Sequence, residues 1–259
     1  MNTNSVVTVQ KQLYEEIFDP DNIKKWEFHT TSDPLIRFMR DQGLYFGLAK
    51  LKKYTQIEQK DFINWRVLIV CGGVGGEGLF LTKYGFKHVT VSDFSENALQ
   101  VCKKIAPEVK TIQLNAEDLN LDDNSFDLVF VRAGLHHLSR PALGVTEMLR
   151  VCKKAIIFFE PHTGFLSNIF GDEYENQNGV INFVYRWNKN MLEQTVKSFL
   201  LKKYTLIKCL RYWNHPVIIH KVVKLFPSKM RLLIAKIVYG FLNTIVPSVG
   251  NSMVGIVIK

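Results

Sequence analysis

The sequence predicts an α/β fold built on a mainly parallel, Rossmann-like sheet, and three observations lead to this prediction. Between residues 65 and 165, short apolar runs rich in β-branched residues alternate with segments of helical character. The first run leads into a glycine cluster, Gly72–Gly78, and then into a helix-compatible segment. Polar side chains follow the ends of several runs, where parallel strands present a binding edge. The glycine turn and the helix start after it make a nucleotide cradle, because no Cβ atom blocks a ligand and free N–H groups face it.

Five strands are predicted in the central part of the chain. They cover Val67–Cys71, Lys87–Asp93, Lys110–Leu114, Phe126–Val131 and Ala155–Phe159. Helices are expected between them at Leu79–Tyr84, Glu96–Lys104 and Pro141–Val151. Strands that alternate with helices in this way form parallel sheets, whose carboxyl ends share one edge. The side chains that should therefore meet there are Asp93, Asn115, Arg132 and Glu160.

The flanking segments differ in character, and we predict three parts: residues 1–64, 65–165 and 166–259. The first part is expected to be a helical lid, with helices at Val9–Phe18 and after a cap at Ser32 or Asp33, and an amphipathic segment at Lys50–Phe62. The last part is expected on the substrate side. Its predicted elements are a helix at Asn190–Leu200, a strand at Tyr204–Arg211, a helical insertion within Trp213–Val246 and a final strand at Met253–Ile258.

Composition and charge limit the class of protein. The chain has 259 residues and a formal net charge of +9, which fits either an ordinary basic protein or one attracted to an anionic partner. Its four cysteines, Cys71, Cys102, Cys152 and Cys209, form no close pair, so a metal site or a disulfide framework is not expected and a reduced, cytoplasmic setting is favoured. The first ten residues lack the apolar core of a signal peptide, and no uncharged run is long enough to span a membrane.

Two ligands fit the cradle when the residues alone are considered. Gly73–Gly78 satisfies the G-x-G-x-x-G pattern of NAD-binding folds. Asp93 lies about 20 residues beyond the glycines, where a carboxylate can accept hydrogen bonds from ribose hydroxyls. An NAD-dependent oxidoreductase is therefore one alternative.

The motifs together resemble the class I S-adenosylmethionine (SAM)-dependent methyltransferases, in particular the small-molecule group that includes the ubiquinone-biosynthesis type. The resemblance covers about residues 60–165 and the final strand. Val67–Gly75 is similar to the family's first motif, in which Cys71 stands where the first glycine is usual. Asp93 matches the acidic end of the second strand, and Asn115–Glu117 matches the segment that frames the adenine. Leu135–Leu138 is similar to the segment that follows the fourth strand.

The resemblance implies SAM as the cofactor and a seven-stranded sheet with helices on both faces, whose last strand, Met253–Ile258, is antiparallel. An antiparallel last strand argues against NAD, whose doubly wound domains have an all-parallel sheet. The residues that the resemblance places at the cofactor are Val70, Cys71, Gly72, Gly73, Gly75, Asp93, Phe94, Asn115, Ala116, Glu117 and Arg132. Among them, Arg132 can pair with the carboxylate of the cofactor or face solvent.

Candidates for a catalytic base are His136, His137, Glu160 and His162, which follow the fourth and fifth strands. A hydroxyl acceptor needs a base of this kind. The alternatives are that the histidines cap a helix or pack beside the cofactor, and that Glu160 forms a structural ion pair. We expect the acceptor to be a small molecule, a sugar or a lipid-linked precursor, methylated at oxygen, with nitrogen and carbon left open. A SAM-fold partner subunit without catalysis is a further alternative.

The stretch Trp213–Val246 sets Lys and Arg among apolar residues and has three interpretations. It can form two helices that cover the active site, or a surface that sits on an anionic membrane and admits a lipid-linked acceptor. It can also bind RNA phosphates, which we disfavour because no accessory domain and no clustered basic-aromatic motif accompanies it. We expect a cytoplasmic location, with peripheral membrane contact through residues 213–246 as an alternative.

Overall fold

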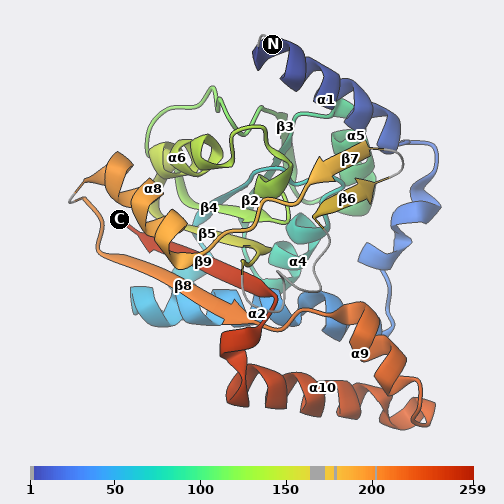
Figure 1. Cartoon of the computed structure of the whole chain (residues 1–259). Helices are drawn as coiled ribbons and strands as arrows, with labels where there is room; N and C mark the ends of the chain where they lie inside the picture. The colour runs from blue at the N-terminus through green and yellow to red at the C-terminus, as the bar shows by residue number, and fades with distance from the viewer. Residues whose placement is uncertain (1–2, 164–172, 178–179, 202) are drawn as a thin grey trace.

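The computed structural model describes residues 3–163, 173–177, 180–201 and 203–259, and its centre is a seven-stranded sheet (Figure 1). The strands are β1 (Arg66–Ile69), β2 (His88–Asp93), β3 (Lys110–Gln113), β4 (Phe126–Arg132), β5 (Cys152–Pro161), β8 (Leu206–Tyr212) and β9 (Ser252–Ile258). They lie in the order β3-β2-β1-β4-β5-β9-β8. Strand β9 pairs antiparallel with β5 and β8, while the other pairs are parallel, so the predicted sheet and its antiparallel last strand are confirmed.

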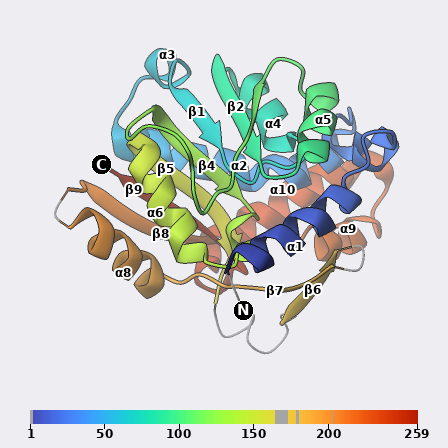
Figure 2. The ribbon, with the colours of Figure 1, turned by 90° about the horizontal axis from the view of Figure 1, so that it is seen from above.

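Helices cover both faces of the sheet (Figure 2). One face carries α2 (Pro34–Thr55), α4 (Gly76–Tyr84) and α5 (Glu96–Ile105), and the other carries α6 (Pro141–Val151) and α8 (Lys189–Leu200). Successive strand residues point to opposite faces, and this alternation divides the core in two. In β4, for example, Phe130 packs with the first group of helices and Val129 with the second.

Local sequence signals account for the helix ends. Helix α2 begins where the Asp33 carboxylate accepts hydrogen bonds from the backbone N–H groups of Leu35 (2.8 Å) and Ile36 (3.0 Å), so Asp33 rather than Ser32 is the cap. It ends at Thr55 because Gln56 takes a left-handed conformation (φ 52°). The amphipathic segment predicted at Lys50–Phe62 is therefore two helices, the end of α2 and the short α3 (Gln59–Phe62).

Other elements were not predicted or differ from the prediction. Helix α1 (Thr3–Ile17) begins earlier than expected. A separate hairpin, β6 (Tyr174–Gln177) and β7 (Val180–Phe183), lies between β5 and α8 along the chain. Short 3-10 helices are η1 (Ile23–His29), η2 (Leu135–His137) and η3 (Pro247–Val249).

The insertion before the last strand forms α9 (Pro216–Val223) and α10 (Ser228–Ile245). Both helices share an apolar cluster with α2, and they lie at the opposite side of the molecule from α1 (Figure 1). The insertion therefore packs on α2 rather than over the pocket described below.

Candidate active site

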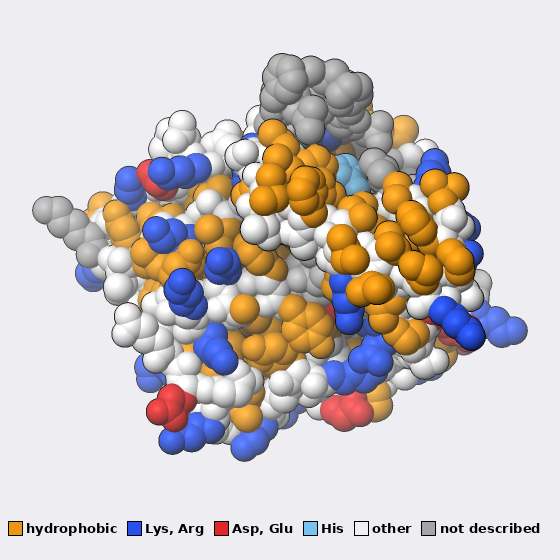
Figure 3. All heavy atoms as spheres, turned by 90° about the horizontal axis from the view of Figure 1, so that it is seen from below, with side chains coloured by type: hydrophobic (Ala, Val, Ile, Leu, Met, Phe, Trp, Pro, Cys, Tyr) orange, Lys and Arg blue, Asp and Glu red, His pale blue; other side chains and the backbone are white. Residues whose placement is uncertain are grey.

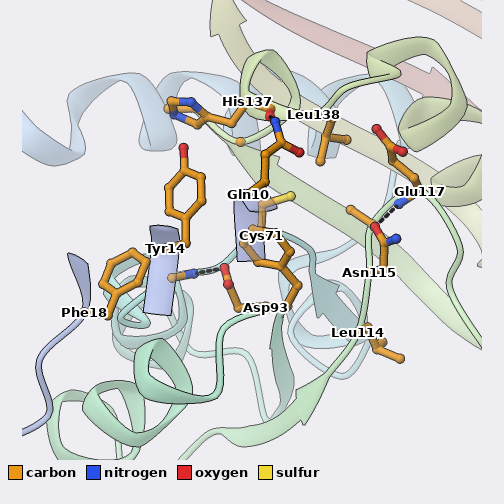
Figure 4. A pocket seen from close by; sticks show the side chains of 15 residues that line it. Gln10, Tyr14, Phe18, Cys71, Asp93, Leu114, Asn115, Glu117, His137 and Leu138 are labelled. Carbon is orange, nitrogen blue, oxygen red and sulfur yellow. Dashed lines mark hydrogen bonds between the residues drawn. The ribbon is translucent and has the colours of Figure 1, made fainter. Parts of the chain in front are cut away.

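A pocket of about 190 Å³ lies at the carboxyl edge of the sheet (Figure 4). Its floor comes from the residues that follow β1, β2, β3 and β4. Its cover comes from α1. The pocket thus lies where a parallel α/β sheet is expected to bind its ligand.

The glycine turn after β1 brings the backbone to the pocket. Cys71, Gly73 and Gly75 all have positive φ, of 49°, 48° and 81°. Gly73 lines the pocket, and a Cβ atom added there would approach no atom closer than the Phe18 ring, at 3.8 Å. Cys71 takes the left-handed conformation that glycine adopts freely, at the position where the resemblance leads us to expect a glycine. Burial raises the pKa of the Cys71 thiol well above its usual value, which makes the thiol a poor nucleophile.

Asp93, at the end of β2, is the buried carboxylate of the pocket. One of its oxygens accepts a hydrogen bond from Gly73 N–H (2.8 Å), and the other accepts one from Ser95 N–H (3.0 Å). Burial raises the pKa of Asp93 to about 6 although these backbone bonds oppose the shift. Each oxygen of an ionised carboxylate can accept a further bond, so Asp93 can hold two ribose hydroxyls.

The segment after β3 lines the opposite end of the pocket with Leu114, Asn115 and Ala116. Asn115 Oδ1 accepts a hydrogen bond from the N–H of Glu117 (3.0 Å), which orients the side-chain amide. The carboxylate of Glu117 is itself bound to the Arg140 side chain (2.8 Å) and backbone N–H (2.5 Å). We infer that Glu117 shapes this loop, while Asn115 and Ala116 can frame an adenine ring.

Helix α1 and the residue after it close the pocket with Gln10, Tyr14 and Phe18, which sequence reasoning missed. Their spacing of four residues puts them on one face of a helix, and this pattern within the predicted helix was the available signal. Glu15 fixes α1 in place, because its carboxylate accepts hydrogen bonds from three donors at the start of α5. These donors are Ser95 Oγ (2.8 Å), Glu96 N–H (2.9 Å) and Asn97 N–H (2.9 Å).

The four candidate bases have different surroundings. Glu160 is buried and accepts hydrogen bonds from Gly134 N–H (2.9 Å) and Leu135 N–H (2.8 Å), and it lies 2.6 Å from His136 Nδ1. These contacts hold η2 against the end of β5, and Glu160 is not among the residues that line the pocket. Among the four, the structure brings only His137 to the pocket wall.

His162 lies outside the pocket, in a bridge between the end of β5 and Trp187. Burial lowers its pKa to about 4, so its ring is neutral near pH 7. His162 therefore helps to join the chain to β5, and its position gives it no contact with the pocket wall.

Four residues that we expected at the cofactor do not line the pocket. Val70 is buried in the sheet core, and Gly72 packs against Val91, where an added Cβ would lie 2.5 Å from Val91 Cγ1. Gly75 allows α4 to approach Cys102, whose sulfur would lie 2.3 Å from an added Cβ. These positions need small or apolar residues for packing.

Arg132 is the fourth of these residues. Its side chain lies 3.3 Å from the Glu77 carboxylate and donates to the carbonyl of Arg40 (3.0 Å). Arg132 thus forms an ion pair that joins the end of β4 to the first turn of α4, and its pairing with a cofactor carboxylate stays a prediction.

The described residues contain no group of three or more His, Cys, Asp or Glu side chains that could hold a metal ion. In the same part of the chain, no helix is long and apolar enough to cross a membrane.

Residues 69–159 match the methyltransferase domain family. The chain is 37% identical over 91 residues to a demethylmenaquinone methyltransferase of Clavibacter sepedonicus, which covers 34% of this chain and 37% of that protein. It is 31% identical over 137 residues to a ubiquinone/menaquinone biosynthesis C-methyltransferase of Bartonella bacilliformis, covering 49% of this chain and 52% of that protein. It is also 30% identical over 141 residues to a demethylmenaquinone methyltransferase of Staphylococcus haemolyticus, covering 51% of this chain and 59% of that protein. The matched regions thus span between about a third and three fifths of these curated relatives.

Solved structures confirm the fold. Phosphoethanolamine N-methyltransferase 2 of Haemonchus contortus, in complex with SAM, has a TM-score of 0.54 and 20% identity, covering 83% of this chain and 52% of that chain. A SAM-dependent methyltransferase of Thermotoga maritima has a TM-score of 0.52 and 15% identity, covering 86% and 98%. At these identities the two structures show a shared fold, and the match of residues 69–159 to the methyltransferase domain supports SAM as the cofactor.

Proposed function

We propose that this protein transfers a methyl group from SAM to a small-molecule acceptor, because residues 69–159 match the methyltransferase domain and the chain has the class I methyltransferase fold. The observation that carries the proposal is the buried Asp93 carboxylate, which two backbone N–H groups hold at the wall of the pocket. When bound, SAM supplies an electrophilic methyl group on a sulfonium centre.

The residues of the pocket fit this cofactor. Asp93 would hold the ribose, and Asn115 with Ala116 would frame the adenine. Gly73 leaves room beside the backbone for the rest of the molecule, because no side chain occupies that position. Tyr14 on α1 and Phe18 directly after it would cover the bound cofactor.

His137 is the best candidate for a base, by comparison with the other titratable residues of the pocket wall. The Cys71 thiol has a pKa far above its usual value, Asp93 is engaged by the glycine turn, and Glu117 is engaged by Arg140. The His137 ring lies 6.0 Å, centroid to centroid, from the Tyr14 ring. We infer that His137 accepts a proton from an acceptor hydroxyl, because it alone of the four candidate bases lies at the pocket wall, while His136 and Glu160 position the short helix that carries it.

For the acceptor we propose a hydroxylated aromatic ring of the quinol type, linked to a lipid chain. The names of the curated relatives favour a quinone precursor methylated at carbon, in contrast to the oxygen that we expected from the sequence. Removal of the hydroxyl proton by His137 also assists methylation at a ring carbon, because a phenolate is a stronger carbon nucleophile than a phenol. The cytoplasmic location expected from the sequence is part of this proposal.

The test is methyl transfer from methyl-labelled SAM to a reduced 2-prenyl-1,4-naphthoquinone with a short side chain. We expect label in the organic product, and loss of the adjacent ring-proton signal in its NMR spectrum. His137→Ala should lower the turnover about 10²- to 10⁴-fold. His88→Ala, at the exposed start of β2 on the opposite edge, serves as the matched control. An O-methyl product would restore oxygen as the acceptor atom, and equal turnover in His137→Ala would remove His137 from the mechanism.

A further inference from the structure

Helix α10 has two apolar faces, and its neighbours cover only one of them. On the inner face, Ala235 and Tyr239 are buried in a cluster with residues of α2 and α9. The outer face carries five side chains that are between 45% and 62% exposed: Met230, Leu233, Ile237, Phe241 and Ile245. Their spacing of three and four residues makes one continuous line along the helix, which we call the outer stripe. The contacts of α10 with α2 and α9 involve the inner face. Packing within the protein therefore does not explain why the outer stripe is apolar.

The exposure of these residues is concentrated in one part of the protein. Eight of the 18 large hydrophobic side chains that are exposed among the described residues lie within residues 222–245. At the turn between α9 and α10, Leu225 is 82% exposed and Phe226 is 37% exposed. Contiguous apolar surface of this kind is rare on monomeric proteins and marks an interaction site.

Charge in the same region is of one sign. Eleven of the chain's 33 Lys and Arg residues follow Glu193, but none of its 24 Asp and Glu residues does. The positive net charge of the chain therefore arises in its last quarter. The cations of the insertion are Lys221, Lys224, Lys229, Arg231 and Lys236, and within the described residues none of them forms an ion pair with a carboxylate. Figure 3 shows hydrophobic patches bordered by Lys and Arg side chains on this side of the molecule.

We propose that the outer stripe and the lysines beside it form a docking surface for a bilayer that contains anionic phospholipids. Apolar side chains on a helix that lies in the plane of the bilayer insert at the level of the headgroups, and the flanking lysines contact the phosphates. An RNA partner would leave the aliphatic side chains without a counterpart, and a second copy of this basic surface would bring like charges together. The surface chemistry thus favours a lipid bilayer over either alternative.

The insertion begins and ends at the carboxyl edge of the sheet. The chain leaves the sheet for α9 at Tyr212 and returns at Ser252, and these two residues are paired. Ser252 also pairs with Pro161 at the end of β5, so the insertion is anchored at the carboxyl edge that carries the pocket. This inference is independent of the acceptor, because docking on a bilayer requires neither SAM nor methyl transfer.

The first test is cosedimentation of the full chain with vesicles of phosphatidylcholine containing about 30% phosphatidylglycerol, compared with vesicles of phosphatidylcholine alone. We expect binding to the anionic vesicles only, and a loss of more than tenfold in affinity in Ile237→Asp/Phe241→Asp. The matched control is Phe199→Asp, because Phe199 is an exposed aromatic residue on α8. All three side chains face solvent, and thermal unfolding of each variant verifies that the fold is kept.

The second test separates charge from apolar contact. Lys224→Gln/Lys229→Gln/Lys236→Gln should weaken binding by roughly fivefold per lysine, or roughly a hundredfold in all. A triple Lys→Gln change elsewhere on the surface, at Lys83, Lys87 and Lys110, should have little effect.

Three outcomes would overturn the proposal. Wild-type protein could stay in the supernatant with anionic vesicles, or the aspartate variant could bind them as well as wild type does. In the third outcome, wild-type protein would not bind vesicles but would form a dimer or bind RNA. Ile237→Asp/Phe241→Asp would then abolish that dimer or that RNA binding.

Discussion

Replacement of Asp93 tests the cofactor site most directly. The carboxylate accepts hydrogen bonds from Gly73 and Ser95, and its remaining acceptor positions are available to two ribose hydroxyls. In Asp93→Asn the side chain keeps its size but loses its charge. Its NH2 group must also take the place of one carboxylate oxygen. An NH2 group cannot accept a hydrogen bond, so it meets the hydrogen-bond donor that the oxygen had bound. Asparagine can therefore no longer satisfy both the glycine turn and both hydroxyls.

The expected magnitude follows from the number of bonds lost. A hydrogen bond to a charged group contributes about 1.5–3 kcal/mol. Loss of one such bond to the ribose, together with weakening of the other when the charge is removed, should cost about 3 kcal/mol, which is roughly a hundredfold in affinity. If the asparagine NH2 group faces a backbone N–H group of the turn, the two donors oppose each other. This should also lower the free energy of unfolding by about 1–3 kcal/mol.

The assay is calorimetric titration with S-adenosylhomocysteine, which resembles SAM but cannot donate a methyl group, and in parallel with NAD. We expect wild-type protein to bind S-adenosylhomocysteine and not NAD, and Asp93→Asn to bind it roughly a hundredfold more weakly. Asp118→Asn is the matched control, because Asp118 is an exposed carboxylate outside the pocket wall. Thermal unfolding of both variants separates a weakened site from a lost fold.

Two results would refute the reasoning. If Asp93→Asn bound S-adenosylhomocysteine as tightly as wild type does, the ribose would not lie at Asp93, and the site would have to be placed elsewhere. If wild-type protein bound NAD and not S-adenosylhomocysteine, the alternative of an NAD-dependent oxidoreductase would hold. The NAD titration is essential because an acidic residue at the end of the second strand can also hold the ribose of NAD.

Further predictions concern pH, stability and the cover of the pocket. The pKa of Asp93 is raised to about 6, and only the ionised carboxylate accepts bonds from two hydroxyls, so protonated Asp93 must lose its proton when S-adenosylhomocysteine binds. In calorimetry, the affinity should therefore be constant above about pH 7 and fall about tenfold by pH 5. Glu160→Gln disturbs the buried bonds to η2 and should lower the free energy of unfolding by about 2–4 kcal/mol in denaturant titration, while the exposed Glu58→Gln should not. Glu15→Ala should release α1 and weaken S-adenosylhomocysteine binding about tenfold, with faster proteolysis near residue 18; tight binding and unchanged protection would contradict this role. Burial opposes ionisation of Glu15, but bonds from the start of α5 lower its pKa below the usual value, so in wild type this contact is kept at neutral pH and lost only as the pH falls through that lowered pKa. Cys71→Gly should keep ligand binding and change the free energy of unfolding by less than about 1 kcal/mol. The reason is that the backbone of residue 71 has a left-handed conformation, which glycine adopts freely.

Several parts of the site could be predicted because they depend on short stretches of sequence. Glycine favours the positive φ that Gly73 has in the turn after β1, and the strand that ends at Asp93 has a clear apolar pattern. Helix α6 has the predicted bounds, since Pro141 starts it and its apolar residues repeat at helical spacing. The last strand was expected at the end of the chain, and the structure pairs it antiparallel with β5.

Other features depended on partners far away in the sequence. Nothing near Glu160 indicates that its carboxylate binds Gly134 and Leu135, which lie 26 and 25 residues earlier. In the same way, no local pattern shows that Arg132 pairs with Glu77 rather than with a ligand.

By itself, the sequence determined the order of strands and helices, the glycine cradle and the acidic residue beside it, because backbone preferences and apolar periodicity act over a few residues. Only the tertiary structure decided which polar side chains stay available at the pocket. It also decided that α1 covers the pocket, and that α10 buries one apolar face on α2 and leaves the other exposed. The physical reason is that a buried polar group must find a hydrogen-bond partner, and an apolar helix face a packing partner, and the fold alone determines which distant segments supply them.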